Sequence, residues 1–153
     1  MRLGTWALAG SALLLGTAVA SASGKPQAGS AADTIAGRQA AYRLSAAVFS
    51  GMKGAIERGD DVKTQAFAAG ALAGWAKAIP GMFPAGTDIA PSNALPTVWS
   101  DRAGFEAKAA DYAAAAAKLA ELAKAGDKAG FAAQYAAVGK TCGACHSGFR
   151  KAD

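Results

Sequence analysis

The stretch KTCGACHSGFR, residues 140–150, contains both cysteines of the chain and its only histidine. Cys142 and Cys145 are three residues apart, and His146 follows directly. Residues of these types occur in small disulfides, in redox dithiols and in metal sites. A thioredoxin-type dithiol, however, needs a strand–turn–helix setting. Structural zinc needs four Cys or His ligands, one more than this chain has. Covalent haem fits best, because the two thiols can form thioethers to the vinyl groups while the next histidine binds the iron.

Residues 1–22 have the pattern of a secretory signal peptide. Met1-Arg2 carries one positive charge, and the following residues 3–24 are uncharged and rich in Leu, Ala, Val, Gly and Ser. Two Ala-x-Ala sequences, starting at Ala18 and Ala20, predict cleavage after position 20 or 22. An uncleaved anchor is the alternative, since about 20 apolar residues can span a bilayer, but the Gly- and Ser-rich end of the stretch argues against it. We therefore expect export to the periplasm and no membrane attachment after cleavage.

A flexible lead-in over residues 23–31 and one domain over residues 32–153 are predicted for the remaining chain. The formal net charge of the full sequence is +5. Lys and Arg are spread along the sequence rather than clustered, which argues against nucleic acid as a partner. No nucleophile, general base or substrate pocket stands out, so we expect no enzymatic activity.

Apolar residues recur at helical spacing throughout this domain, which predicts an all-α fold. One helix begins near residues 31–33 and ends at Arg58, and the stop at Gly59 is followed by a second helix that ends before Pro80. A third begins between residues 96 and 101 and ends at Lys124. The fourth covers residues 128–150. Four helices of roughly 30 Å each favour an antiparallel up-down four-helix bundle.

Both cysteines lie on the inward stripe of the fourth predicted helix. The first helix has a comparable stripe with heptad spacing. These stripes contain, in the fourth helix, Phe131, Tyr135, Val138, Cys142, Cys145 and Phe149, and in the first helix Ile35, Arg38, Tyr42, Ser45, Phe49, Met52 and Ile56. We therefore expect the haem to complete the core, and the chain without haem to fold poorly.

A long loop, residues 80–96, contains four of the five prolines. In an up-down bundle it lies at the haem end. Arg38 is expected there too, where an unpaired buried charge is costly, so it either pairs with a haem propionate or reaches water at the frayed end of the bundle. Gln39 either assists at the propionate or faces solvent. Phe83 is expected to contact the haem, and Ser92 to reach its edge or propionates.

The sixth position of the iron is expected to be empty. Met52 and Met82 are the methionines that remain after signal cleavage. Met52 lies ten residues beyond Tyr42 on the same helix, about 15 Å along its axis, which makes it a core residue. Met82 is expected to pack over the haem edge. The alternative is a low-spin, six-coordinate electron-transfer protein with a methionine ligand.

Four segments resemble the cytochrome c′ family, the class II c-type cytochromes. They are RQAAYRLSAAVFSGMK from Arg38, FPAGTDIA from Phe83, LPTVW from Leu95 and the C-terminal CGACHSGFR. The resemblance implies one covalent haem c per chain, five-coordinate and high-spin, with His146 as the axial ligand. It also implies binding of NO and CO, a homodimer formed through the first two helices, and a redox partner that the sequence does not identify.

The resemblance places Tyr42 over the distal face of the haem, where low-spin relatives have a methionine ligand. A crowded apolar pocket disfavours water and anions, which need hydrogen bonds, and admits small neutral diatomic molecules. The Tyr42 hydroxyl either donates to a ligand or propionate, or only packs. Gas binding and electron transfer both remain open, since a five-coordinate haem does not exclude either.

Overall fold

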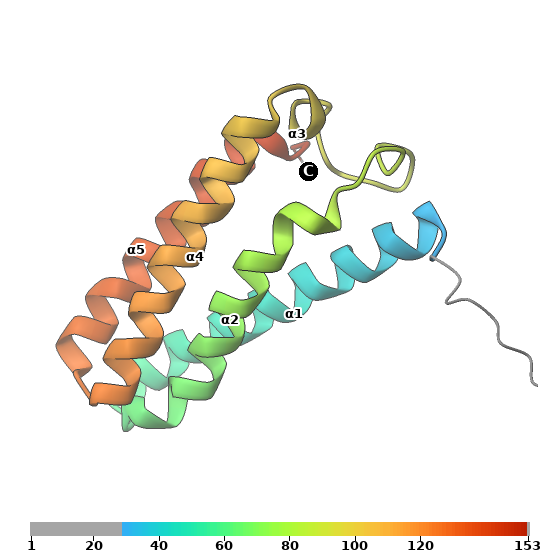
Figure 1. The fold of residues 1–153 in the computed structure, drawn as a ribbon. Coiled ribbons are helices and arrows are strands. Elements are labelled where there is room, and N and C mark those ends of the chain that lie inside the picture. The colour runs from blue at the N-terminus through green and yellow to red at the C-terminus, as the bar shows by residue number, and fades with distance from the viewer. Residues whose placement is uncertain (1–28, 153) are drawn as a thin grey trace, which may run out of the picture.

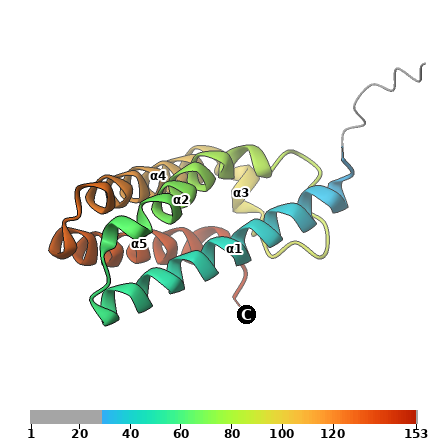
Figure 2. The same ribbon diagram turned by 90° about the horizontal axis from the view of Figure 1, so that it is seen from below.

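The computed structural model describes residues 29–152, which form an antiparallel four-helix bundle (Figures 1 and 2). The predicted signal peptide, residues 1–22, and most of the predicted lead-in lie outside the described residues. Within residues 29–152, no helix combines the length and the apolar character that crossing a membrane would need. The four long helices are α1 (Ala31–Arg58), α2 (Ala66–Ala78), α4 (Arg102–Ala125) and α5 (Lys128–Phe149). The predicted fold class is therefore confirmed.

The helix ends follow from local capping chemistry. Ser30 and Asp33 form a capping box at the start of α1, in which each side chain accepts a hydrogen bond from the backbone N–H of the other. α1 ends at Gly59, which has the left-handed backbone conformation that stops a helix, and Gly126 ends α4 in the same way. Asp127 then caps α5 by accepting from the Gly130 N–H at 2.9 Å. The predicted ends of the first and fourth helices are confirmed to within one residue.

The second and third predicted helices are subdivided. A 3-10 turn, η1 (Val62–Gln65), precedes α2, and another, η2 (Ile79–Met82), follows it. A short helix, α3 (Thr97–Ser100), is separated from α4 by Asp101, whose backbone is not helical. The Asp101 carboxylate accepts from the Gly104 N–H at 3.1 Å, so it caps a new helix instead of continuing the old one.

Two groups of buried side chains form the core. The closed-end cluster holds Met52 with residues of α2, α4 and α5, and Met52 is fully buried there, as predicted for a core residue. The loop-end cluster has Phe83 and Phe105 at its centre, and Trp75 and Trp99 pack against it. These four aromatic residues therefore gather at one end of the bundle.

The loop between η2 and α3 folds over the end of the bundle where α5 finishes (Figure 1). Backbone hydrogen bonds fasten it there: the Leu95 N–H donates to the Phe149 carbonyl at 3.0 Å, and the Lys151 N–H donates to the Asn93 carbonyl at 2.8 Å. The loop and the C-terminal end of α5 therefore lie together, as the up-down topology predicts.

Candidate haem-binding site

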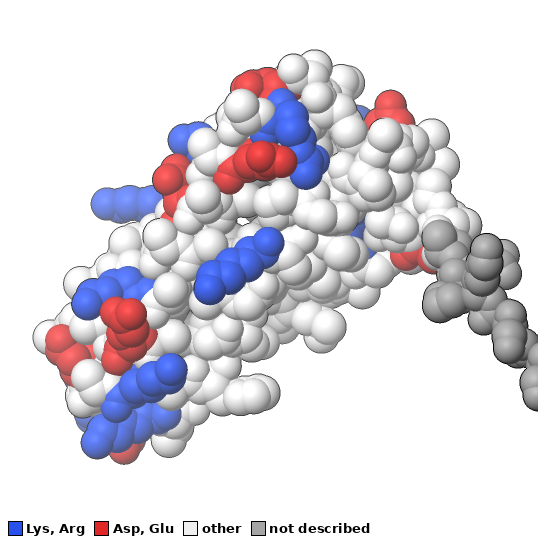
Figure 3. Space-filling view, in the orientation of Figure 1, with Lys and Arg blue, Asp and Glu red and all other residues white. Residues whose placement is uncertain are grey.

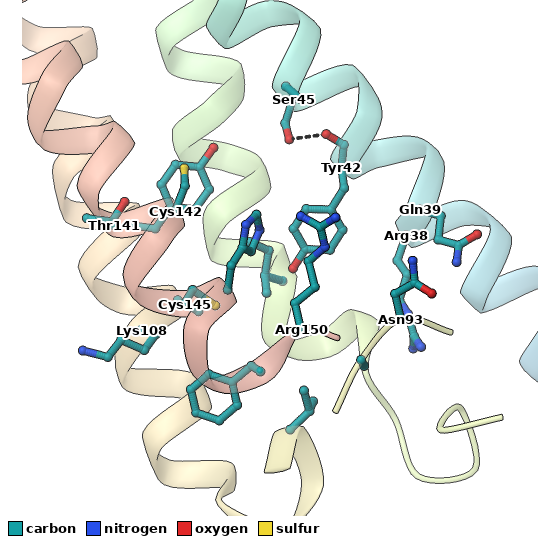
Figure 4. Close-up of a pocket in the computed structure, with 18 of the residues that line it drawn as sticks. Arg38, Gln39, Tyr42, Ser45, Asn93, Lys108, Thr141, Cys142, Cys145 and Arg150 are labelled. Atoms are coloured by element: carbon teal, nitrogen blue, oxygen red, sulfur yellow. Dashed lines mark hydrogen bonds between the residues drawn. The ribbon is translucent and has the colours of Figure 1, made fainter. Parts of the chain in front are cut away.

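A cavity of about 590 Å³ lies between α1, α4, α5 and the loop (Figure 4). This volume is within the range of roughly 300–1,000 Å³ that is usual for small-molecule and cofactor sites. Most of the surface that lines it is apolar. All eight residues proposed from the sequence for the haem site line this one cavity: Arg38, Gln39, Tyr42, Phe83, Ser92, Cys142, Cys145 and His146.

α5 provides the wall that carries the haem-attachment sequence. Cys142 and Cys145 are half-buried and free of any disulfide, and they face the cavity from successive turns of the helix (Figure 4). Burial raises the pKa of both thiols above the ordinary value. His146 also lines the cavity but is exposed, so this edge of the site opens to solvent. The cysteines lie on the inward face, as predicted, although a cavity rather than packed core faces them.

Tyr42 projects from α1 on the opposite wall (Figure 4). Its ring meets Trp75 edge to face, with centroids 5.0 Å apart, and lies 6.4 Å from the ring of Phe83. Burial raises the pKa of Tyr42 well above 10, and the neighbouring Cys145 adds to this shift. The phenol is therefore neutral at physiological pH.

Arg38 is buried at the loop end of the cavity, with 2% of its surface exposed. Its Nη1 donates to the Thr87 hydroxyl at 2.7 Å and to the Met82 carbonyl at 3.2 Å. Its Nη2 donates to the Thr87 carbonyl at 2.7 Å and to the Ser92 hydroxyl at 2.6 Å. The guanidinium also lies over the Phe83 ring, 4.3 Å from the centroid. Arg38 thus ties the loop to α1.

This environment changes the interpretation of Arg38. Its burial contradicts the alternative that the side chain reaches water at the end of the bundle. None of the ion pairs among the described residues includes Arg38, and desolvation lowers the pKa of its guanidinium. The hydrogen-bond partners are neutral, so the buried positive charge still lacks a compensating negative charge. The expected contact with a haem propionate stays a prediction.

Gln39 and Ser92 have structural partners as well as places in the cavity wall. The Gln39 side-chain amide donates to the Pro91 carbonyl at 2.9 Å. The Ser92 hydroxyl accepts from Arg38 and, at 3.2 Å, from the Ala94 N–H. Both residues therefore help to hold the loop, and their contacts with a haem also stay predictions.

Other cavity-lining residues were not identified from the sequence as site residues. Phe105 and Tyr112 on α4 line the cavity, as do Arg43 on α1 and Lys108 on α4. Burial raises the pKa of Tyr112 to about 12, and nearby Cys142 contributes. Heptad spacing identifies Phe105 and Tyr112 as inward-facing, but periodicity does not distinguish a core position from a cavity wall.

Neither remaining methionine lines the cavity. Met52 belongs to the closed-end cluster, and Met82 packs against the outside of the loop-end cluster. The residues that do line it suit haem c: two thiols and an adjacent imidazole on one wall, with aromatic rings around them. The donor set and the apolar surface therefore both fit this cofactor.

A family model described as Cytochrome C′ matches residues 33–150, which include the whole cavity wall. The chain belongs to the cytochrome c′ family. Proteins of the cytochrome c′ family carry covalently attached haem c, and the cofactor expected from Cys142, Cys145 and His146 agrees with this.

Relatives support the assignment to the cytochrome c′ family over most of the chain. The cytochrome c′ of Rubrivivax gelatinosus is 37% identical over 123 residues, which cover 78% of this chain and 95% of that protein. The cytochrome c′ of Pararhodospirillum photometricum is 43% identical over 82 residues, which cover 53% of this chain and 66% of that protein, just under two thirds of its length. A nitric oxide complex of a cytochrome c prime variant from Alcaligenes xylosoxidans has a similar structure, with a TM-score of 0.76 and 28% identity, covering 83% of this chain and all of that one.

Proposed function

We propose that this chain is an exported cytochrome c′ whose haem iron is bound by His146 on one side, carries no protein ligand on the other, and binds NO and CO there. The observation that carries this proposal is the position of Tyr42, an aromatic residue with a neutral hydroxyl, across the cavity from the haem-attachment sequence. The absence of Met52 and Met82 from the cavity wall supports an iron without a second protein ligand. The nitric oxide complex of the structural relative supports the class of ligand.

Each of the three haem-binding residues on α5 has one role in this proposal. Cys142 and Cys145 hold the haem through thioethers, and His146 supplies the axial nitrogen. The haem, when bound, supplies an iron that coordinates a diatomic molecule reversibly. Since all three residues come from two successive turns of one helix, α5 alone fixes the position of the cofactor.

Tyr42 determines which molecules reach the iron. Its ring is held by Trp75 and Phe83, so it cannot move aside freely. A small neutral diatomic molecule enters at a steric cost, whereas an anion or a water molecule must also leave its hydrogen bonds with the solvent. The site therefore favours NO and CO.

Arg38 provides the positive charge for a haem propionate. Neutral oxygen atoms hold its guanidinium in place but do not balance its charge. A carboxylate that enters the cavity beside Arg38 gains a charge-assisted interaction in a buried setting. Gln39 and Ser92 line the same end of the cavity and assist there.

One-electron transfer is the second candidate function. The observation that favours it is the exposure of His146 at the edge of the cavity, which brings the expected haem close to solvent and to a partner. Electron transfer is compatible with gas binding, because reduction of the iron requires no free coordination position. No catalytic turnover is part of the proposal.

The optical spectrum of the purified haem protein, reduced and then exposed to CO, tests the proposal. We expect a broad high-spin spectrum that changes rapidly with CO. Met52→Leu and Met82→Leu variants should give the same spectra as the unaltered protein. Sharp low-spin bands without CO uptake, or a shift to high spin in either variant, would show a methionine ligand and contradict the proposal.

Export and dimer formation belong to the same proposal. Mass spectrometry of periplasmic protein should show a chain that begins after position 20 or 22. For the dimer, the observation is that Leu44 on α1 and Phe67 on α2, the two helices of the expected interface, are 68% and 89% exposed. Large apolar side chains exposed to this extent on two such helices fit a surface that a partner protomer covers.

A Phe67→Lys variant should be monomeric by sedimentation at a concentration where the unaltered protein is dimeric. Ile89→Lys is the matched control, since Ile89 is also exposed, at 50%, but lies in the loop. Equal behaviour of the two variants would argue against an interface formed by α1 and α2.

A further inference from the structure

The cavity wall carries positive but not negative side chains. Its charged residues are Arg38, Arg43, Lys108 and Arg150, and no Asp or Glu is among the residues that line it. Two haem propionates would offset only part of this charge. Four of the lysines and arginines that look scattered in the sequence therefore lie around one site in the fold.

The cavity opens on the side formed by α1, the loop and α5. All of its exposed lining residues belong to these three segments, while those from α4 are buried or half-buried. The exposed residues are Arg43, Ala46, Ser50, Asn93, His146 and Arg150. A protein that approaches this opening meets the edge of the expected haem first.

Carboxylates are missing from α5 and from the middle of α1. Residues 34–56 of α1 contain no Asp or Glu, and neither does α5. Arg43 and Lys151 are exposed, and neither forms an ion pair among the described residues. Arg43 lines the cavity, and Lys151 donates to the carbonyls of two residues of the cavity wall, to Asn93 from its backbone N–H at 2.8 Å and to Ser92 from its Nζ at 3.2 Å. We call these two residues the cationic rim.

The charge pattern differs on another side of the bundle. Figure 3 shows Asp and Glu side chains next to Lys and Arg on the face that carries α2 and α4. α4 itself contains three ion pairs, of Arg102 with Glu106, Lys108 with Asp111, and Lys118 with Glu121. Opposite charges there are interspersed, as on an ordinary solvated surface, so the one-sided charge at the cavity opening is a local feature.

We propose that the cationic rim is the docking site for an acidic one-electron carrier protein. This inference rests on the electron-transfer part of the proposed function and names the chemistry of the partner. In the transfer, one electron leaves the partner's cofactor, which is oxidised, and ferric haem iron becomes ferrous, while no bond forms or breaks. A surface with one sign of charge around a cleft attracts an oppositely charged partner and orients it toward the opening.

A small acidic flavodoxin, fully reduced, serves as the probe. We expect the second-order rate constant for reduction of the ferric protein to fall about tenfold in an Arg43→Glu, Lys151→Glu double variant at low ionic strength, and to differ little at high salt, where charges are screened. Titration calorimetry with both proteins oxidised should show a matching loss of affinity, without any electron transfer.

The matched control is a Lys77→Glu, Lys124→Glu double variant. It changes the net charge by the same amount, but Lys77 on α2 and Lys124 on α4 do not line the cavity. We expect it to react and bind more like the unaltered protein than the rim variant does, since the attraction between two charges weakens with the distance between them. Equal losses in the two double variants would overturn the assignment of a local docking site.

Two further measurements distinguish docking of an acidic protein from gas binding at the haem and from binding of nucleic acid. The CO spectrum of each variant reports on the haem pocket, so a failure of gas binding in the unaltered protein would refute the proposed function without affecting the docking result. A short DNA duplex used as a competitor tests the class of partner. If the duplex binds the rim as tightly as flavodoxin does, the assignment to an acidic protein is wrong.

Discussion

Arg38 and Thr87 are 49 residues apart in the chain, yet the Arg38 guanidinium donates to both the hydroxyl and the carbonyl oxygen of Thr87, each at 2.7 Å. Thr87 is 2% exposed, so both partners of this contact are buried. The Thr87 hydroxyl also donates to the Pro84 carbonyl at 2.8 Å, which makes it a junction between α1 and the loop. The order of the loop end therefore depends on one buried cation and one hydroxyl.

A Thr87→Val substitution should destabilise the protein by about 1–3 kcal/mol, because it leaves an N–H of a buried cation without its acceptor. The measurement is the free energy of unfolding of the haem-loaded protein in guanidinium chloride. Thr64→Val is the control, since the exposed Thr64 hydroxyl makes a comparable local bond, to the Asp61 carbonyl at 2.6 Å. A loss below about 0.5 kcal/mol at Thr87 would show that the loop does not depend on this contact.

A Tyr42→Ala substitution should accelerate CO binding to the reduced protein by about tenfold or more, the factor that corresponds to removal of about 1.4 kcal/mol of steric hindrance. Tyr42→Phe keeps the ring and should leave the association rate nearly unchanged. Flash photolysis measures both rates. A large effect of Tyr42→Phe on the dissociation rate would instead assign a hydrogen bond to the Tyr42 hydroxyl.

A Cys142→Ser, Cys145→Ser double variant should lose the covalent haem and, with it, the cooperative thermal transition of the bundle. The reason is the cavity of about 590 Å³ that the cofactor would otherwise fill with apolar surface. Circular dichroism during heating measures the transition. The mutated residues are only half-buried, and Ser is close to Cys in size. A transition like that of the unaltered protein would therefore contradict the role given to the haem.

Stability should fall as the pH rises above about 10. Burial raises the pKa of Tyr112 to about 12 and that of Tyr42 also above the ordinary value of 10, so the folded state retains protons that the unfolded state releases. The stabilisation from these phenols is complete below pH 10 and is lost as the pH rises through the folded pKa. In a Tyr42→Phe, Tyr112→Phe double variant the alkaline decline in unfolding free energy should be shallower, and an unchanged slope would locate the titrating groups elsewhere.

The bundle was predictable because its determinants are local. Gly59 and Gly126 stop helices by their own backbone conformation, and Asp127 caps the next helix within three residues. The haem-attachment sequence is local as well, and the antiparallel topology then places the loop beside it. None of these features needs a contact between distant segments.

The partners of Arg38 could not be predicted in this way. They lie 44 to 54 residues further along the chain, in a loop without periodicity, so the sequence offers a buried charge without showing what surrounds it. The break between α3 and α4 at Asp101 could not be predicted for a different reason. An Asp at this position is compatible with the interior of one long helix and also with the cap of a new one. Heptad spacing indicates that Tyr112 faces inward, but its position on the cavity wall depends on the spacing of three helices.

Cys142, Cys145 and His146 lie near the end of α5, the last helix of residues 29–152, and this position determines when haem attachment becomes possible. A ribosome releases these residues only when the rest of the bundle has already been made. The first three long helices therefore exist for a time without the group that fills the space between them. The protein is therefore expected to pass through an incompletely folded state, in which the haem can still be inserted between the helices and attached.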